Sequence, residues 1–120
     1  HAYYQQVEQW PFPTLKRFEY FLKAKEELLG YDFVIFMNGN LIVKKTISEE
    51  EFLPQNKQKL FVTLHPGFYN KKPNEFTYDR NPDCSAYIEE GKGYCYFAGG
   101  LNGGLANEFI KMIHLNQNIE

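Results

Sequence analysis

The feature that most constrains the fold is a change of hydrophobic spacing at Gly30. Over residues 14–29 the apolar side chains recur at helical spacing, and Gly30 follows where a left-handed helix cap is favoured. Residues 32–37 then read Asp-Phe-Val-Ile-Phe-Met, a short and almost wholly apolar run that is typical of a strand buried on both faces. A helix that leads into a buried strand indicates an α/β arrangement.

The rest of the chain continues this alternation of element types. The acidic run after Ser48 favours a short helical turn, because carboxylates stabilise a helix N-terminus. A helix with an apolar face is predicted from Leu105 onwards, and residues 66–93 form a long polar connection of a kind that is usually functional. Further strands are predicted over 41–43, 60–64 and 94–98.

Composition narrows the class of protein. A chain of 120 residues allows one domain, and its 33 Leu, Ile, Val and Phe residues exceed the roughly 20% below which a chain stays disordered. The net charge of −2 lacks the basic excess that binding along nucleic acid requires. Nucleic acid is therefore not expected as a partner. Because no run approaches the roughly 18 apolar residues of a membrane span, we expect a soluble protein with no membrane span in this segment.

The cysteines and histidines do not predict a metal site. Cys84 and Cys95 are predicted to be free thiols, since a disulfide between them would need an oxidising compartment that nothing in the sequence indicates. His1, His65 and His114 stand at none of the spacings that zinc sites use. We therefore expect no dedicated metal centre.

Asn38-Gly39-Asn40 follows the apolar run and has two interpretations. Asn-Gly between strand-like runs is a strong signal for a type I′ hairpin turn. Alternatively, two amide side chains at the end of a buried strand point at one ligand. Amides form hydrogen bonds but bind hard cations less strongly than carboxylates do, so a site of this kind need not use a metal.

Three further candidates for a binding site each have a structural alternative. The run Gly99–Gly104 is either a sharp bend or a loop whose backbone amides approach a phosphate, although it does not match the P-loop pattern. His65, at a strand end, either orients a polar ligand or is structural. Arg17, near a helix start, either is solvated or clamps a phosphate or a sugar hydroxyl.

Taken together, several blocks of sequence resemble one family, glycosyltransferase family 6, over essentially the whole chain. This family includes the histo-blood-group A and B transferases, the α-1,3-galactosyltransferases and their bacterial relatives. The blocks occur in the family's order. They are Trp10-Pro11 with Thr14-Leu15-Lys16-Arg17-Phe18, Asn38-Gly39-Asn40, His65-Pro66-Gly67-Phe68-Tyr69, Phe76-Thr77-Tyr78-Asp79-Arg80, Ala86-Tyr87-Ile88, and residues 96–104.

The resemblance implies a fold and a reaction. The fold is the GT-A-type nucleotide-diphospho-sugar transferase fold, a Rossmann-like mixed sheet with flanking helices, present here in part. The reaction is a retaining transfer of α-linked GalNAc, or galactose, from its UDP donor to O3 of a galactoside that in relatives often carries fucose. Vertebrate members hold manganese with Asp-x-Asp where this chain has Asn38 and Asn40. Some bacterial members lack those carboxylates and work without a metal, so the resemblance implies no cofactor here.

The resemblance also assigns roles to individual residues. Arg17, Asn38 and Asn40 match donor-binding positions. The segment 98–100 matches the donor-choosing block, in which the small residues Ala98 and Gly100, on either side of Gly99, favour UDP-GalNAc over UDP-galactose. His65 and Thr77 match positions that line the acceptor galactose.

The same resemblance places residues 1–120 in the central portion of a single GT-A catalytic domain. A uridine-binding strand is expected before His1 and the catalytic glutamate beyond Glu120, so none of the 120 residues is assigned a catalytic role and the chain alone is expected to be inactive. We expect a bacterial, cytoplasmic enzyme. The alternatives are a UDP-galactose-using enzyme, a noncatalytic carbohydrate-binding module of the same fold, and an unrelated α/β domain.

Overall fold

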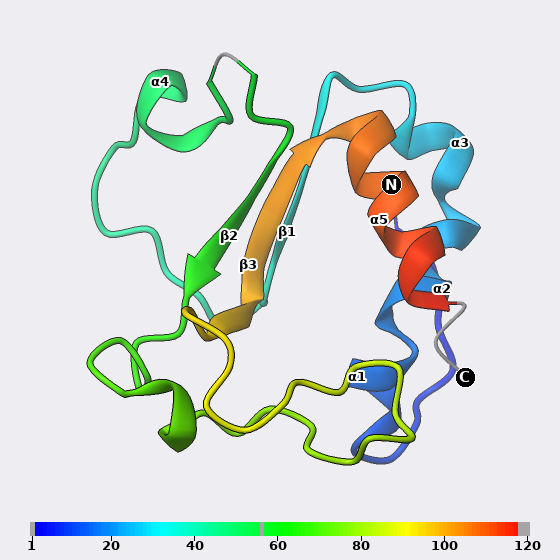
Figure 1. The fold of residues 1–120 in the computed structure, drawn as a ribbon. Helices are drawn as coiled ribbons and strands as arrows, with labels where there is room; N and C mark the ends of the chain where they lie inside the picture. Colours follow the sequence, from blue (N-terminus) through cyan, green and yellow to red (C-terminus); the bar gives the residue numbers. More distant parts are fainter. Residues whose placement is uncertain (1, 56, 118–120) are drawn as a thin grey trace.

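The computed structural model describes residues 2–55 and 57–117 and consists of a small antiparallel sheet with most of its helices on one side (Figure 1). The strands are β1 (Phe33–Met37), β2 (Leu60–Leu64) and β3 (Phe97–Leu105), in the order β1-β3-β2. The helices are α1 (Phe12–Leu15), α2 (Arg17–Lys23), α3 (Lys25–Leu28), α4 (Glu49–Phe52) and α5 (Ala106–Gln117), with a 3-10 turn η1 (Pro73–Glu75). The α/β prediction is confirmed, but within the described residues the sheet is antiparallel rather than mixed.

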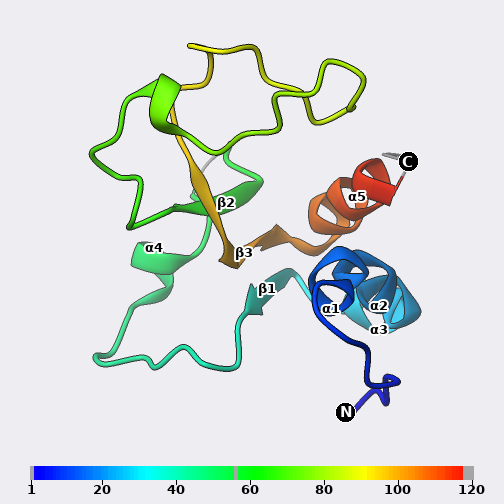
Figure 2. The same ribbon diagram turned by 90° about the horizontal axis from the view of Figure 1, so that it is seen from below.

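The N-terminal helix predicted over residues 14–29 is divided into α1, α2 and α3. Lys16 and Ala24 interrupt it with ψ angles of 5° and 12°, far from the value near −42° of an α-helix. The three short helices still gather with α5 on one side of the sheet, as the view from below shows (Figure 2). The predicted apolar stripe therefore does cover a sheet face, although the helix that carries it is not continuous.

The hydrophobic core lies between these helices and one face of β1. Val34 and Phe36 pack there against Phe109, Ile110 and Ile113, which are at most 4% exposed. The side chains that alternate with them on β1, Ile35 and Met37, are 38% and 47% exposed. The prediction that this strand is buried on both faces is therefore wrong for the described residues, because only one face is covered by helices.

The glycine run belongs to β3, the central strand, and is neither a bend nor a phosphate-binding loop. The strand predicted over 94–98 and this run form one strand that starts at Phe97. A Cβ atom on Gly103 would overlap the carbonyl oxygen of Val34 in β1, and one on Gly104, whose φ is +154°, would overlap that of Lys59 beside β2. Glycine is needed here because two neighbouring backbones approach the central strand closely.

The segment between β1 and β2 confirms one prediction and contradicts another. The acidic turn after Ser48 is α4, and it begins with a capping box in which Ser48 Oγ accepts from Glu51 N at 3.3 Å and Glu51 accepts from Ser48 N at 3.2 Å. Residues 41–43 form no strand, because the partner of β1 is β3 and none of the described strands pairs with them. This segment is exposed instead.

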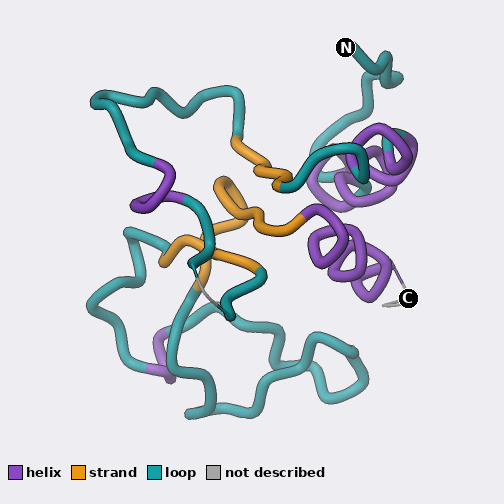
Figure 3. Tube along the Cα trace, turned by 90° about the horizontal axis from the view of Figure 1, so that it is seen from above, coloured by secondary structure: helices purple, strands orange, loops and turns teal. Residues whose placement is uncertain are grey.

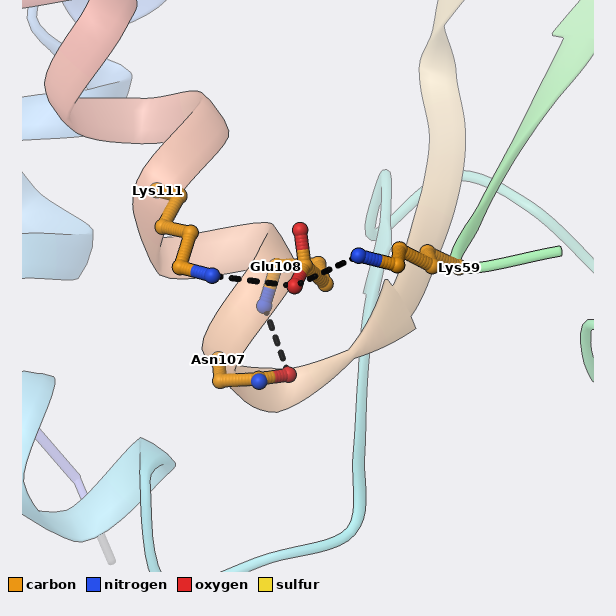
Figure 4. Close-up of polar contacts among 4 residues, drawn as sticks. All are labelled: Lys59, Asn107, Glu108 and Lys111. Carbon is orange, nitrogen blue, oxygen red and sulfur yellow. Dashed lines mark hydrogen bonds and ion pairs between the residues drawn. The ribbon is translucent and has the colours of Figure 1, made fainter. Parts of the chain in front are cut away.

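An ion-pair network joins α5 to the start of β2. Glu108 Oε1 accepts from Lys111 Nζ at 3.0 Å and from Lys59 Nζ at 3.3 Å, as the close-up shows (Figure 4). Asn107 Oδ1 accepts from the backbone N–H of Glu108 at 2.8 Å. The two lysines lower the pKa of Glu108. The network thus fixes the first turn of α5 against the strand on the far side of β3.

The long connection between β2 and β3 has little regular structure beyond η1, and Figure 3 draws most of it in the teal of loops and turns. Arg80 organises it, because its guanidinium donates to the carbonyl oxygens of Ile88 and Glu89 at 2.6 Å each and of Pro73 at 3.2 Å. Cys84 and Cys95 are free thiols, as predicted.

The described residues leave much apolar surface uncovered. The molecule exposes 9617 Å², whereas a folded monomer of 14.2 kDa exposes about 6,800 Å². Ile35, Met37 and residues 41–47 line an open apolar hollow of about 670 Å³. Among helices within residues 2–55 and 57–117, none has the length and apolar character needed to cross a membrane.

Candidate functional site

The candidate site is a cleft of about 420 Å³ at the end of the sheet where β1 and β2 finish and β3 begins. Because β3 is antiparallel to both neighbours, its first residues lie beside the last residues of β1 and β2. The antiparallel order therefore brings segments far apart in the sequence to one place. The cleft is lined by Asn38, Leu41, Thr63, His65, Pro66, Ala98, Gly99, Gly100 and Leu101.

Asn38 follows the last residue of β1 and is fixed against β3. Its backbone N–H donates to the carbonyl oxygen of Gly100 at 2.9 Å, and its carbonyl oxygen accepts from Leu41 N at 3.0 Å. The side-chain Nδ2 lies only 2.9 Å from the place that a Cβ on Gly100 would take. The amide of Asn38 thus fills the space beside the glycine and borders the cleft.

The hairpin interpretation of Asn38-Gly39-Asn40 is wrong. A type I′ turn needs a positive φ at both central residues, and Gly39 is not among the glycines with positive φ. The chain turns at this point without pairing residues 41–43 to β1. Asn40 is exposed and does not line the cleft, so of the two amides the structure brings only Asn38 to it.

Arg17 is bound to the strand that lines the cleft. Its Nη1 donates to the carbonyl oxygen of Gly99 at 2.7 Å, and its guanidinium carbon lies 4.4 Å from the centre of the Phe36 ring. Partial burial lowers the pKa of Arg17, which nevertheless remains a cation because a guanidinium stays protonated in proteins. Arg17 is therefore not a fully solvated helix residue, and it places a positive charge at the rim of the cleft.

His65 follows the last residue of β2 and lines the opposite wall. Its Nδ1 accepts from Gly67 N at 3.1 Å, which places the proton of the neutral ring on Nε2. Its backbone N–H donates to the carbonyl oxygen of Tyr96 at 2.8 Å, and its ring meets Phe68 edge-on at 5.0 Å between centres. His65 thus has both a structural role and a remaining N–H donor.

Thr77 does not line the cleft. It lies in the long connection, where its Oγ1 is 2.8 Å from the hydroxyl of Tyr96. Tyr96 therefore stands between Thr77 and His65, the two residues predicted to contact the acceptor. Ala98, Gly99 and Gly100 all line the cleft, as the predicted donor block requires if donor and acceptor meet there.

Two polar residues near the cleft were not predicted from the sequence. Thr63 lies in β2 beside an irregularity in strand pairing and donates to the carbonyl oxygen of Leu101 at 2.9 Å. Asn102 Nδ2 donates to the carbonyl oxygen of Gly99 at 3.3 Å, so that Gly99 accepts from two side chains. Thr63 could have been found as a polar residue inside an otherwise apolar strand. Asn102 could have been found as the polar residue within the glycine run.

The cleft is lined by an amide, a histidine and small strand residues, and an arginine is bonded to one of those strand residues. This arrangement suits a polar, anionic ligand, and comparison with known proteins identifies the family. The family model described as glycosyltransferase family 6 matches residues 8–117, so the chain belongs to that family.

Several family members are similar to the chain over different lengths. The O-antigen biosynthesis glycosyltransferase WbnI of Escherichia coli is 30% identical over 106 residues, which are 88% of this chain and 44% of that protein. Histo-blood group ABO system transferase 1 of Rattus norvegicus is 53% identical over 58 residues, 48% of this chain and 16% of the transferase. The globoside alpha-1,3-N-acetylgalactosaminyltransferase 1 of Gallus gallus is 36% identical over 59 residues, 47% and 17% of the two chains. The chain thus spans less than half of the length of these relatives.

The residues at the position of the family's Asp-x-Asp do not fit a divalent cation. Asn38 and Asn40 offer neutral amide oxygens in place of carboxylates, and only Asn38 borders the cleft. The described part of the chain contains no group of three or more His, Cys, Asp or Glu side chains placed to hold a metal ion.

Proposed function

We propose that the chain forms the donor- and acceptor-facing cleft of a glycosyltransferase that moves a sugar from a nucleotide diphosphate to a glycan. The observation that carries this proposal is the convergence of Arg17, Asn38 and residues 98–100 with His65 at one end of the sheet. Family membership supplies the reaction class. The geometry supplies a cation beside the cleft, an amide donor and small residues over 98–100, which suit a sugar joined to a diphosphate.

The proposed donor is UDP-GalNAc. Ala98 leaves this part of the cleft wall without a large side chain, and an N-acetyl group needs space that a larger residue would take. The space beside Gly100 is taken by the amide of Asn38. The chicken relative, by its name, transfers N-acetylgalactosamine through an alpha-1,3 linkage, which agrees with this assignment. UDP-galactose is the alternative donor. O3 of a galactoside, with or without fucose, is the proposed acceptor.

The proposed reaction needs no metal. A divalent cation would otherwise neutralise the leaving diphosphate. In its absence Arg17 supplies positive charge at the rim, and Asn38 Nδ2 donates a hydrogen bond to a donor oxygen. Only one guanidinium N–H of Arg17 is engaged by Gly99, so other N–H groups remain for a phosphate or sugar oxygen.

The acceptor lies on the His65 side of the cleft in this proposal. The Nε2–H of His65 is available as a donor because its Nδ1 already accepts from Gly67. The catalytic glutamate that the family resemblance implies is not assigned to any of the described residues in this proposal. The proposed enzyme is bacterial and cytoplasmic. The described residues bind and orient the two sugars.

The test follows UDP release by the full-length enzyme from UDP-GalNAc and UDP-galactose, with 2′-fucosyllactose as acceptor. We expect faster turnover of UDP-GalNAc, unchanged by EDTA. Asn38→Ala should lower turnover of both donors. Arg17→Lys should lower it by a smaller factor, because the substitution loses the bond to Gly99 but keeps the positive charge. Activity that requires manganese would refute metal independence. Galactoside binding without turnover of either donor would instead favour the noncatalytic binding module.

A further inference from the structure

We infer that Tyr96 is a positioning residue for the acceptor side of the cleft, where it couples Thr77 to His65. This inference rests on the proposed function, because that function gives His65 and Thr77 to the acceptor. The structure shows the two residues apart, with Thr77 outside the cleft, and Tyr96 between them. Tyr96 touches both through different groups, which makes the separate contributions of its ring and its hydroxyl testable.

The ring of Tyr96 is held in one orientation by aromatic neighbours from the long connection. The nearest is Phe68, whose ring centre lies 4.4 Å away. Phe76, which is 7% exposed, closes the cluster at 5.7 Å. Further contacts of the ring are with Tyr78 at 5.3 Å and His65 at 5.8 Å. A ring enclosed on so many sides cannot rotate without disturbing the loop, so its hydroxyl points in a fixed direction.

The hydroxyl of Tyr96 holds Thr77. Its oxygen lies 2.8 Å from Thr77 Oγ1 and 3.5 Å from the carbonyl oxygen of the same residue. Thr77 is exposed, and among the residues that the structure describes its hydroxyl has Tyr96 as its side-chain hydrogen-bond partner. Without the Tyr96 hydroxyl, the Thr77 side chain would populate several rotamers, and its hydroxyl would form hydrogen bonds with water.

The backbone of Tyr96 holds His65. Its carbonyl oxygen accepts from His65 N at 2.8 Å, one residue beyond the pairing of Leu64 with Phe97. Ala98, two residues after Tyr96 in the chain, lines the cleft. Tyr96 therefore connects the exposed threonine, the cleft histidine and the start of the donor block through one side chain and one peptide group.

The matched variants are Tyr96→Phe, Thr77→Val and the double variant, each in the full-length enzyme. Tyr96→Phe keeps the ring and its packing and removes only the hydroxyl. We expect the KM for 2′-fucosyllactose to rise about three- to tenfold, as loss of one hydrogen bond predicts, with the KM for UDP-GalNAc unchanged. Thr77→Val should have a similar effect. The double variant should be no worse than the worse single variant, because both remove one interaction.

Tyr69→Phe is the control, because Tyr69 lies in the same connection and is 71% exposed. It should leave both KM values unchanged. A purely structural role for the Tyr96 hydroxyl would lower the melting temperature and kcat without separating the two KM values, and that result would overturn the inference. Additive effects of Tyr96→Phe and Thr77→Val would also overturn it.

The failure of this inference can be told apart from failure of the proposed function. Active wild-type enzyme with an unchanged Tyr96→Phe variant overturns the inference alone. If the wild type binds 2′-fucosyllactose without transferring sugar, the Kd of the same variants for 2′-fucosyllactose is measured by calorimetry. We then expect the Kd to rise about three- to tenfold, as for the KM. If it neither transfers nor binds, the proposed function and this inference are both overturned.

Discussion

Gly100→Ala tests whether the glycine at this position serves the amide of Asn38 or the N-acetyl group of the donor. A Cβ at Gly100 would lie 2.9 Å from Asn38 Nδ2 and 3.5 Å from Asn38 Cγ. The first distance is several tenths of an ångström shorter than ordinary contact between these atoms. The side-chain amide must therefore move away from β3, whereas the backbone bond between Asn38 and Gly100 can stay.

The magnitude follows from what moves. Overpacking costs about 1–3 kcal/mol in general, and the low end applies because the terminal amide of Asn38 is the mobile end of a half-buried side chain. Loss of its hydrogen bond to a charged donor oxygen costs about 1.5–3 kcal/mol. We therefore expect kcat/KM to fall about 10- to 150-fold, with a fall in melting temperature of only about 2–4 °C.

The assay measures kcat/KM for UDP-GalNAc and UDP-galactose in the full-length enzyme. If the alanine acts through Asn38, both donors lose by a similar factor, and adding Gly100→Ala to Asn38→Ala costs little more. Ala98→Leu is the control, because Ala98 lines the same cleft and should reduce turnover of UDP-GalNAc selectively. A selective loss of UDP-GalNAc in Gly100→Ala, of equal size with and without the Asn38 amide, would refute this reasoning.

Three other predictions concern stability. Gly103→Ala should destabilise the fold by about 3 kcal/mol in a denaturant titration, because backbone atoms of β1 block the position of its Cβ. Gly39→Ala is the control, since a Cβ there meets nothing within 4 Å. Equal effects of the two substitutions would contradict the close-packing argument. Arg80→Lys should speed hydrogen exchange in the long connection, since a lysine cannot reach several carbonyl oxygens at once; unchanged exchange would remove Arg80 as its organiser. The lowered pKa of Glu108 means that its ion pairs stabilise the fold above the ordinary glutamate pKa, and that this stabilisation is lost as pH falls from there through the lowered pKa. Glu108→Gln should therefore flatten the acid side of a plot of melting temperature against pH, and parallel curves would show that the network contributes nothing.

The elements that the sequence predicted correctly are those that local pattern decides. The apolar run 32–37 contains β1, the run 60–64 is β2, and Ser48 caps a short helix through a side chain three residues away. Two of the errors depend on pairing between distant segments. Residues 41–43 have the composition of a strand but no neighbour to pair with, and Gly99–Gly104 has the composition of a loop but lies between two strands.

In the candidate site, too, local sequence predicts less than the pairing of distant segments decides. The site residues could be named from blocks of sequence, whereas the distances between them follow from strand register. Met37 pairs with Leu101, which puts Asn38 beside Gly100, and the irregularity after Val62 brings His65 to Tyr96. A shift of one residue in either pairing would turn the side chains to the opposite face and separate the amide from the glycine. The close approach at Gly103 and Gly104 resists such a shift, since a neighbouring residue with a side chain cannot take either place. The glycines that misled the sequence reading of β3 are therefore also the residues that hold the cleft in register.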